Sequence, residues 1–199
     1  MMKTLLFVDS CISQRGEGSR TRLLCKTFID SFLAANPDYE VVCVDVEALN
    51  LPAFTLPMIE ERDQLLHEGH TDLPQFSYAR EFAAADRIVV GAPYWDMAFP
   101  AVLRAYVEHI CANRICYCYG EYGPKGLCRA DKLMYLTTGG GFIDDYGNIG
   151  YHHWVMLCRQ FGIELCETIV ADAMDITPEL REEHLSAALK KAEEIGRNW

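Results

Sequence analysis

The sequence predicts an α/β protein in which a parallel sheet is covered by helices on both faces. Short runs that are apolar throughout alternate with longer segments whose apolar residues recur at helical spacing. Strands without a polar face are typical of a sheet buried between two helical layers. The chain has 199 residues, of which 50% are hydrophobic and 24% charged, so we expect one domain spanning residues 1–199.

Five segments have the length and apolar character of buried strands. They are Leu5–Val8, Val41–Val44, Ile88–Ala92, Leu133–Thr137 and Ile163–Val170.

The segments between these runs predict helices. The first spans Ser19–Ala35 and is stopped by Asn36-Pro37, since proline disfavours helical backbone in the residue before it. Several others begin at a proline, which is well suited to the first helical turn. These are Pro57–His67, Pro74–Ala85, Pro100–Ala112 and Pro178–Ile195, and a further helix without a proline start is predicted over Tyr151–Phe161.

The least regular stretch is Cys111–Arg129, which is rich in tyrosine, cysteine and glycine. The alternation over Cys116–Tyr119 predicts a strand or hairpin added to the main sheet, with a turn at Gly123-Pro124.

Charge and cysteine content exclude several classes of function. The net charge of −11 repels phosphate backbones and anionic membranes, so we expect neither nucleic-acid nor membrane binding. The apolar runs are far shorter than the ~20 residues of a membrane span. The N-terminal run meets Asp9 too early for a secretion signal, so we expect a cytoplasmic protein with thiols rather than disulfides among its 9 cysteines.

The loop after the first strand runs from Ser10 to Thr21 and leads into a helix. Its hydroxyl groups and glycines stand at a helix N-terminus, which suits a phosphate, and Arg15 and Arg20 add cationic donors. It matches neither a P-loop nor the dinucleotide fingerprint, because Thr21 stands where a third glycine is needed. An ordinary N-cap at Ser19 is an equally good interpretation.

The loop after the third strand is unusually rich in large side chains. Between Pro93 and Ala101 it carries Tyr94, Trp95, Met97 and Phe99. A wall of such side chains suits a flat conjugated ligand, and a hydrophobic staple or a subunit contact is the alternative.

The loop after the fourth strand reads Thr137-Thr138-Gly139-Gly140-Gly141-Phe142. Three glycines allow the backbone to approach a ligand closely. Ligands of such sheets bind at the carboxyl ends of the strands, so the three loops together predict a site for a planar cofactor that bears a phosphate, namely flavin mononucleotide (FMN).

The sequence resembles the flavodoxin-like NAD(P)H:acceptor oxidoreductases, a family that includes FMN-dependent azoreductases and quinone reductases. The resemblance covers the whole chain. It is carried by the segments Ala92–Met97, Leu103–Glu108, Tyr119–Leu127 and Thr137–Gly140. It implies a flavodoxin-like, doubly wound sheet of five parallel strands in the order 2-1-3-4-5.

The resemblance also implies the cofactor-binding residues. The FMN phosphate would be held by Ser10, Ser19, Arg20 and Thr21. The flavin ring would be lined by Pro93, Tyr94, Trp95, Asp96 and Met97, and its pyrimidine side approached by Thr138, Gly139, Gly140 and Gly141. Asp96 is acidic where azoreductases have an amide, which is expected to lower the reduction potential of the flavin.

Quinone reductases of this family also have a tyrosine and a histidine six residues apart beyond the glycine-rich turn. Tyr146 and His152 have this spacing here, displaced by one residue. The resemblance implies a catalytic role for the pair, and a histidine exposed at a helix start is the alternative.

The activity implied is a two-electron, ping-pong reduction of a quinone, azo compound or similar small aromatic acceptor, with tightly bound FMN and with NADH or NADPH as the donor. A homodimer is also implied, with Tyr106–Ile110 and Cys111–Tyr122 as candidate contacts.

Three alternatives stay open. A flavodoxin-type electron-transfer protein shares the fold, and a regulator or scaffold would bind no flavin. An iron–sulfur flavoprotein needs clustered cysteines, but the spacing of Cys111, Cys116, Cys118 and Cys128 matches no known cluster or zinc pattern, so no metal is expected.

Overall fold

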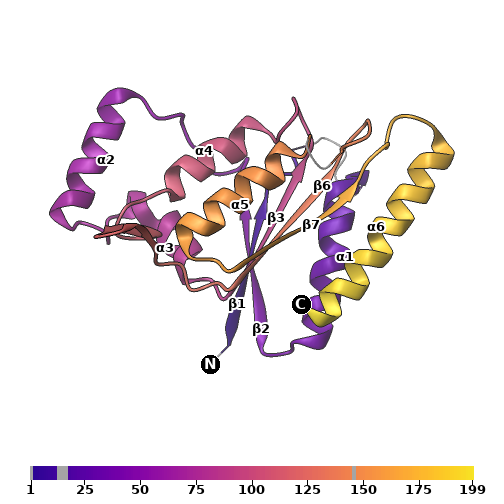
Figure 1. Cartoon of the computed structure of the whole chain (residues 1–199), viewed down its shortest axis with the longest axis horizontal. Helices are drawn as coiled ribbons and strands as arrows, with labels where there is room; N and C mark the ends of the chain where they lie inside the picture. Colours follow the sequence, from indigo (N-terminus) through magenta and orange to yellow (C-terminus); the bar gives the residue numbers. More distant parts are fainter. Residues whose placement is uncertain (1, 13–17, 145–146) are drawn as a thin grey trace.

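The structure is a computed structural model that describes residues 2–12, 18–144 and 147–199. In these residues, five parallel strands form a sheet in the order β2-β1-β3-β6-β7 (Figure 1). Because β6 and β7 are the fourth and fifth predicted strands, the predicted order is confirmed. The strands are β1 (Lys3–Asp9), β2 (Tyr39–Asp45), β3 (Arg87–Pro93), β6 (Lys132–Thr138) and β7 (Leu165–Ala171).

Helices cover both faces of this sheet, as predicted. On one face lie α1 (Arg20–Ala35) and α6 (Pro178–Asn198), which pack side by side (Figure 1). The other helices belong to the opposite side, where α2 extends furthest from the sheet. They are α2 (Leu56–Glu68), α3 (Ser77–Ala84), α4 (Ala101–Ile110) and α5 (Ile149–Phe161).

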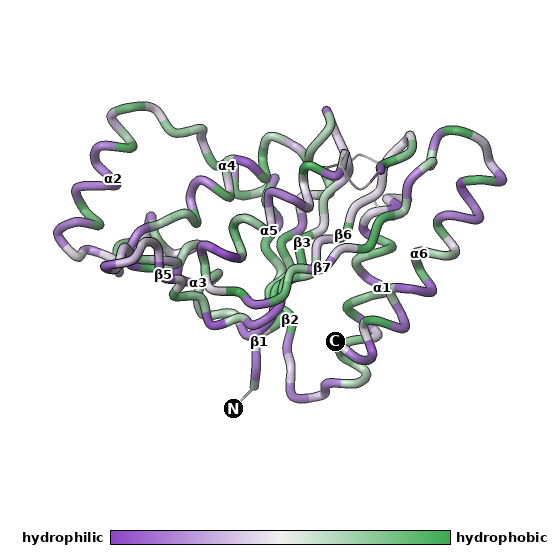
Figure 2. The backbone as a smooth tube through the Cα atoms, in the orientation of Figure 1, coloured by the Kyte–Doolittle hydropathy of each residue, from purple (hydrophilic) through white to green (hydrophobic). Residues whose placement is uncertain are grey.

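Each face of the sheet has its own hydrophobic core. Beneath α1 and α6, Phe28 and Phe32 meet the ring of Trp199 edge-on. On the opposite face, Phe82 packs against Trp154 and Phe161. Figure 2 shows the result as hydrophobic strands in the middle of the molecule, flanked by helices of mixed polarity.

The strand register aligns the ends of the central strands. Asp9 of β1 pairs with Gly91 of β3, and Pro93 at the end of β3 pairs with Thr138 at the end of β6. The loops that follow these three strands therefore leave the sheet at the same edge, as the sequence predicted.

Two local predictions are wrong. The helix predicted over Pro74–Ala85 begins as a 3₁₀ turn at Pro74–Phe76, and only α3 is α-helical. The predicted turn at Gly123-Pro124 lies inside a strand, because β4 (Tyr117–Gly120) and β5 (Gly123–Gly126) form a separate two-stranded hairpin whose tip is Glu121-Tyr122.

The predicted subunit contact on Tyr106–Ile110 is also corrected. Tyr106, Val107 and Ile110 are buried within the chain, in the core between the sheet and α3–α5. Their side chains are therefore not available to a partner. In the part of the chain described by the structure, no helix has the length and apolar character needed to cross a membrane.

Candidate cofactor-binding site

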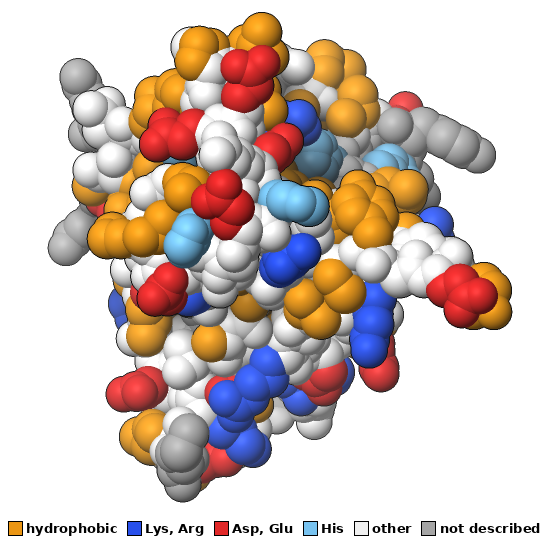
Figure 3. Space-filling view, turned by 90° about the vertical axis from the view of Figure 1, so that its left-hand side faces the viewer, with side chains coloured by type: hydrophobic (Ala, Val, Ile, Leu, Met, Phe, Trp, Pro, Cys, Tyr) orange, Lys and Arg blue, Asp and Glu red, His pale blue; other side chains and the backbone are white. Residues whose placement is uncertain are grey.

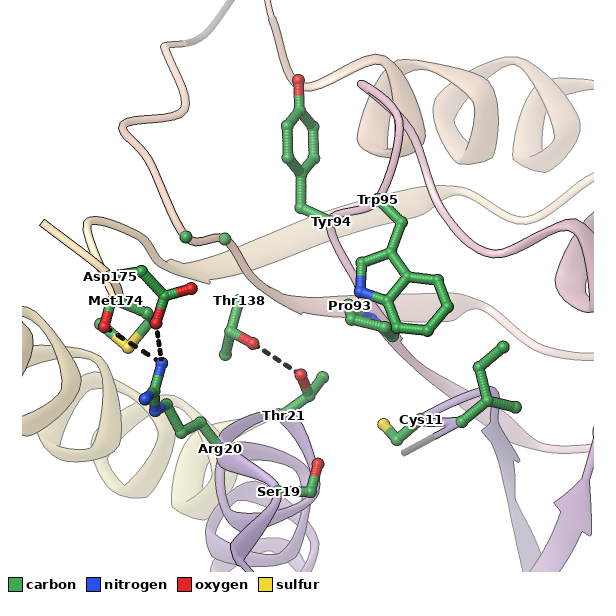
Figure 4. A pocket seen from close by; sticks show the side chains of 13 residues that line it. Cys11, Ser19, Arg20, Thr21, Pro93, Tyr94, Trp95, Thr138, Met174 and Asp175 are labelled. Carbon is green, nitrogen blue, oxygen red and sulfur yellow. Dashed lines mark hydrogen bonds and ion pairs between the residues drawn. The ribbon is translucent and has the colours of Figure 1, made fainter. Parts of the chain in front are cut away.

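A cavity of about 450 Å³ lies at the carboxyl edge of the sheet, where the loops after β1, β3, β6 and β7 meet (Figure 4). This volume is within the range of small-molecule sites. Its lining combines polar and aromatic side chains from four loops. The residues are Cys11, Ile12, Ser19, Arg20, Thr21, Pro93, Tyr94, Trp95, Thr138, Gly139, Gly140, Met174 and Asp175.

The N-terminus of α1 forms one end of the cavity. Ser19 is the N-cap of α1, and its hydroxyl accepts a hydrogen bond from the backbone N–H of Arg22 at 3.3 Å. The first turn of α1 contains no acidic side chain. The helix dipole and the N-terminal amides therefore face the cavity without a carboxylate on the helix itself to cancel them.

The two arginines of this turn have different partners. Arg22 Nε donates to Asp9 Oδ2 at 3.0 Å, at the end of β1. Burial opposes the charged form of Arg22, but the Asp9 carboxylate outweighs it and raises the pKa of the guanidinium. Arg20 instead reaches the loop after β7, where its Nη1 donates to Asp175 Oδ1 at 3.0 Å and to Met174 O at 3.1 Å. Of the two, Arg20 lines the cavity.

Two threonine hydroxyls join α1 to the sheet inside the cavity. Thr21 Oγ1 and Thr138 Oγ1 lie 2.6 Å apart and are both buried (Figure 4). One of them donates to the other, so this hydrogen bond holds the start of α1 against the end of β6. Each hydroxyl still has capacity for a further hydrogen bond, since a hydroxyl has one donor and two acceptor positions.

The loop after β3 supplies the aromatic wall. The Tyr94 N–H donates to Thr138 O at 2.9 Å, and the Tyr94 hydroxyl donates to Gly147 O at 2.8 Å. In Figure 4 the Tyr94 ring points away from the Thr21–Thr138 pair, while the Trp95 indole lies beside Pro93. The indole thus presents a flat surface at the cavity.

A tight turn follows Trp95. The Ala98 N–H donates to Trp95 O at 2.8 Å, and both central residues have positive φ, 49° at Asp96 and 67° at Met97. Residues other than glycine rarely adopt a positive φ, because this backbone conformation is strained. Such strained residues tend to concentrate at functional sites. The turn directs the Asp96 and Met97 side chains into solvent, outside the cavity lining.

The glycine-rich loop after β6 is tied to the loop after β7 by backbone hydrogen bonds. Gly139 N donates to Ala171 O at 3.0 Å, and Met174 N donates back to Gly139 O at 3.0 Å. At Gly140, a Cβ atom would lie 2.8 Å from Asp175 Oδ2, so only glycine fits here without displacing the carboxylate. The Gly139 N–H thus extends the pairing with β7 and is not free to donate to a ligand.

The structure brings most of the predicted cofactor-binding residues to this cavity. Those in the lining are Ser19, Arg20, Thr21, Pro93, Tyr94, Trp95, Thr138, Gly139 and Gly140. Four others are outside it, namely Ser10, Asp96, Met97 and Gly141. Ser10 is fully buried below the wall, where its hydroxyl donates to Gly91 O at 2.8 Å.

The predicted catalytic pair is only partly described. Tyr146 lies outside the described residues, as does Arg15. His152 is in the first turn of α5, exposed and not in the cavity lining. This position matches the alternative interpretation, a histidine exposed at a helix start.

Sequence reasoning missed four lining residues: Cys11, Ile12, Met174 and Asp175. The last two follow the fifth strand, whose loop lacks the glycines and aromatic residues that marked the loops after the third and fourth strands. A signal did exist, because the carboxyl end of every parallel strand meets the same sheet edge.

Cys11 at the cavity is a protonated thiol. A hydrogen bond with Cys25, burial and the charge of Asp9 all raise its pKa. The pKa of the Cys158 thiol is raised in the same way, by a hydrogen bond with Cys166 and by burial. Because the thiolate is the reactive form, a raised pKa disfavours a nucleophilic role for these two cysteines. Among the described residues, no group of three or more His, Cys, Asp or Glu side chains is arranged to hold a metal ion.

This fold and site have known relatives. A family model described as a flavodoxin-like fold matches residues 2–195. The chain belongs to this flavodoxin-like family. An FMN-dependent NADH:quinone oxidoreductase 2 of Clostridium acetobutylicum is 30% identical over 202 residues, and a second such oxidoreductase, of Clostridium perfringens, is 27% identical over 199 residues. Both alignments cover 100% of each chain.

A solved structure agrees with this assignment to the flavodoxin-like family. The crystal structure of an azoreductase from Bacillus anthracis superposes with a TM-score of 0.87 at 25% sequence identity, covering 100% of both chains. The match therefore includes the loops that form the cavity and the β4–β5 hairpin, not the sheet alone.

The Thr21–Thr138 hydrogen bond yields a prediction about stability. Replacing Thr138 by valine leaves the Thr21 hydroxyl buried without this partner, so we expect the free energy of unfolding to fall by about 1–2 kcal/mol. The double variant Thr21→Val/Thr138→Val removes both hydroxyls and should lose less than the sum of the two single changes. Urea denaturation at unchanged m-value measures all three variants. Strictly additive losses would show that the hydroxyls do not interact.

Proposed function

We propose that this protein is an FMN-dependent NAD(P)H oxidoreductase that reduces quinones, azo compounds or similar small aromatic acceptors. The observation that carries the proposal is the convergence of cationic, hydroxyl-bearing, aromatic and glycine-rich loops on one cavity. The FMN-dependent NADH:quinone oxidoreductases and the azoreductase to which the chain is similar along its whole length support it.

The donor set fits FMN. Arg20 and the N-terminus of α1 supply charge and N–H groups for a phosphate, and the hydroxyls of Ser19 and Thr21 stand beside them. At the other side, the Trp95 indole supplies a face for a flat ring system. Bound FMN would supply the redox chemistry by accepting two electrons from a nicotinamide and passing them to an acceptor.

The protein's part is to bind and orient. We propose that Ser10, which lies outside the lining, holds the start of the loop after β1 in place through its hydrogen bond to Gly91 O. Gly139 and Gly140 line the cavity, although a Cβ atom there would meet Ile143 and Asp175 rather than the cavity space. We propose that the backbone at these glycines lies against the ring. No nucleophilic side chain is needed, which agrees with the protonated state of Cys11.

A pure electron-transfer protein is the second candidate, since it uses the same fold. The similarity to NADH-dependent enzymes over the full chain favours the oxidoreductase. Trp95 in the aromatic wall is also 44% exposed. We propose that this exposed surface admits a second planar molecule.

The first test loads the protein with FMN under anaerobic conditions and adds NADH or NADPH. We expect the flavin absorbance to bleach and to return when a benzoquinone or an azo dye is added. A protein that binds FMN but is reduced by neither nicotinamide would be an electron-transfer protein. A protein that takes up no FMN contradicts the proposal.

Asp96 provides a test at the rim of the site. A carboxylate near the ring opposes negative charge on reduced flavin, so Asp96→Asn should raise the two-electron potential. Asp96 is exposed, and solvent screening limits the expected rise to about 30 mV, equivalent to a tenfold change in the equilibrium constant. Spectroelectrochemical titration measures it, with Asp63→Asn on α2 as control. Equal potentials for wild type and Asp96→Asn would exclude this influence.

We also propose that the enzyme is a homodimer. At the tip of the β4–β5 hairpin, Tyr119 and Tyr122 are 70% and 95% exposed. Figure 3 looks at the side of the molecule that carries α2 and the hairpin, where hydrophobic side chains lie among histidines and acidic groups. A hairpin this rich in exposed tyrosine is suited to a protein–protein contact.

The oligomeric state can be measured by sedimentation velocity. We expect twice the chain mass of 22.6 kDa, and a weaker dimer in Tyr122→Ser because the variant loses buried aromatic area. A monomer at all micromolar concentrations would contradict the homodimer.

A further inference from the structure

Arg20, which the proposed function assigns to the phosphate, already forms an ion pair with a carboxylate in the cavity wall. Arg20 Nη1 lies 3.0 Å from Asp175 Oδ1, and Met174 O accepts from the same nitrogen at 3.1 Å. Figure 4 shows both contacts meeting at the guanidinium on the cavity side of α1. The Arg20 side chain is 22% exposed and the Asp175 side chain 61%. The cation is thus mostly covered, and its counter-ion faces solvent.

Asp175 is held at the wall by the backbone around it. Its N–H donates to Gly140 O at 2.9 Å, and the preceding N–H of Met174 donates to Gly139 O. The carboxylate lies directly against Gly140, since a Cβ there would be 2.8 Å from Asp175 Oδ2. Asp175 therefore cannot leave the cavity by a shift of its loop unless these bonds break.

The loop that carries Asp175 is also held in place at Ala173, the residue before Met174. Ala173 is buried, has a positive φ of 58°, and donates its N–H to Gly141 O at 2.9 Å. A non-glycine residue keeps such a backbone only where its surroundings enforce it. The carboxylate thus occupies a defined place beside Arg20.

This arrangement matters for an anionic ligand. A phosphate that binds Arg20 and the N-terminus of α1 must share the guanidinium with a carboxylate that already accepts from it. The two anions also repel each other at short range, which costs binding energy even at a solvent-exposed site. The neutral part of a flavin, its ring and ribityl chain, carries no such penalty.

We infer that Asp175 limits the affinity of this site for the phosphate of FMN. The inference rests on the proposed function, because it takes the Arg20 end of the cavity as the phosphate end. Asp175 acts as the resident counter-ion of Arg20, so the protein holds FMN less tightly than its donors alone would. The effect is specific to flavins that bear a phosphate.

The test is a pair of flavin titrations on the apoprotein, followed by quenching of flavin fluorescence. Asp175→Asn keeps an oxygen that can accept from Arg20 but removes the charge, so the Kd for FMN should fall about tenfold. The Kd for riboflavin, which lacks the phosphate, should stay within about twofold. Riboflavin binding also shows that the variant is folded.

Two further variants complete the design. Asp63→Asn is the control, because Asp63 on α2 resembles Asp175 in charge, exposure and pairing: its side chain is 60% exposed and lies 2.8 Å from Arg62. This variant should change neither the Kd for FMN nor the Kd for riboflavin. Arg20→Gln should weaken FMN about tenfold or more and leave riboflavin unchanged, which places the phosphate at Arg20.

Each remaining outcome overturns the inference. Unchanged or weaker FMN binding in Asp175→Asn would mean that the carboxylate is neutral or helps to position Arg20. An equal gain for riboflavin, or an equal gain in Asp63→Asn, would remove the link to the phosphate. If wild type binds FMN but Arg20→Gln binds it equally well, the phosphate lies elsewhere and the proposed function survives. If wild type binds no flavin, both fail.

Discussion

The parallel pairing of β1, β3 and β6 is the constraint on which the site depends. Because Asp9 pairs with Gly91 and Pro93 pairs with Thr138, the three strands end at one level. Segments up to 117 residues apart in sequence are then forced to share one edge. The hydrogen bonds from Ser10 to Gly91, from Tyr94 to Thr138 and between Thr21 and Thr138 all span this edge. A site of this kind needs no dedicated scaffold beyond the sheet itself.

The start of α1 carries cationic side chains, although the protein as a whole has a negative net charge. A chain with a net charge of −11 places arginines at the start of one helix, and each is met by a carboxylate from a different strand end. Asp9 holds Arg22 behind the cavity wall, whereas Asp175 meets Arg20 at the cavity itself. The first pair fixes the helix start against β1, and the second leaves a cation within reach of a ligand. An acidic protein and a cation at the cavity are thus compatible, because the field of the guanidinium is local.

The side chains that line the cavity are suited to binding a ligand rather than to covalent chemistry. The thiol of Cys11 is kept protonated by its surroundings, and His152 lies outside the lining. What the residues offer instead is hydrogen-bond donors and glycines at one end and an indole at the other. A site of this type leaves the difficult chemistry to a cofactor and controls access and orientation.

The sequence by itself determined the sheet, its helices and most of the lining residues. It did so because buried strands, helix caps and glycine-rich turns are set by local residue pattern. The hairpin tip at Glu121-Tyr122 and the burial of Tyr106 were decided by packing against neighbouring elements, which local pattern does not record. Asp175 and Arg20 are 155 positions apart in the sequence, and the place of Asp175 beside Arg20 depends on the backbone bonds to Gly139 and Gly140. Only the tertiary structure brings that carboxylate to the cavity, since no spacing along the chain relates it to the arginine it pairs with.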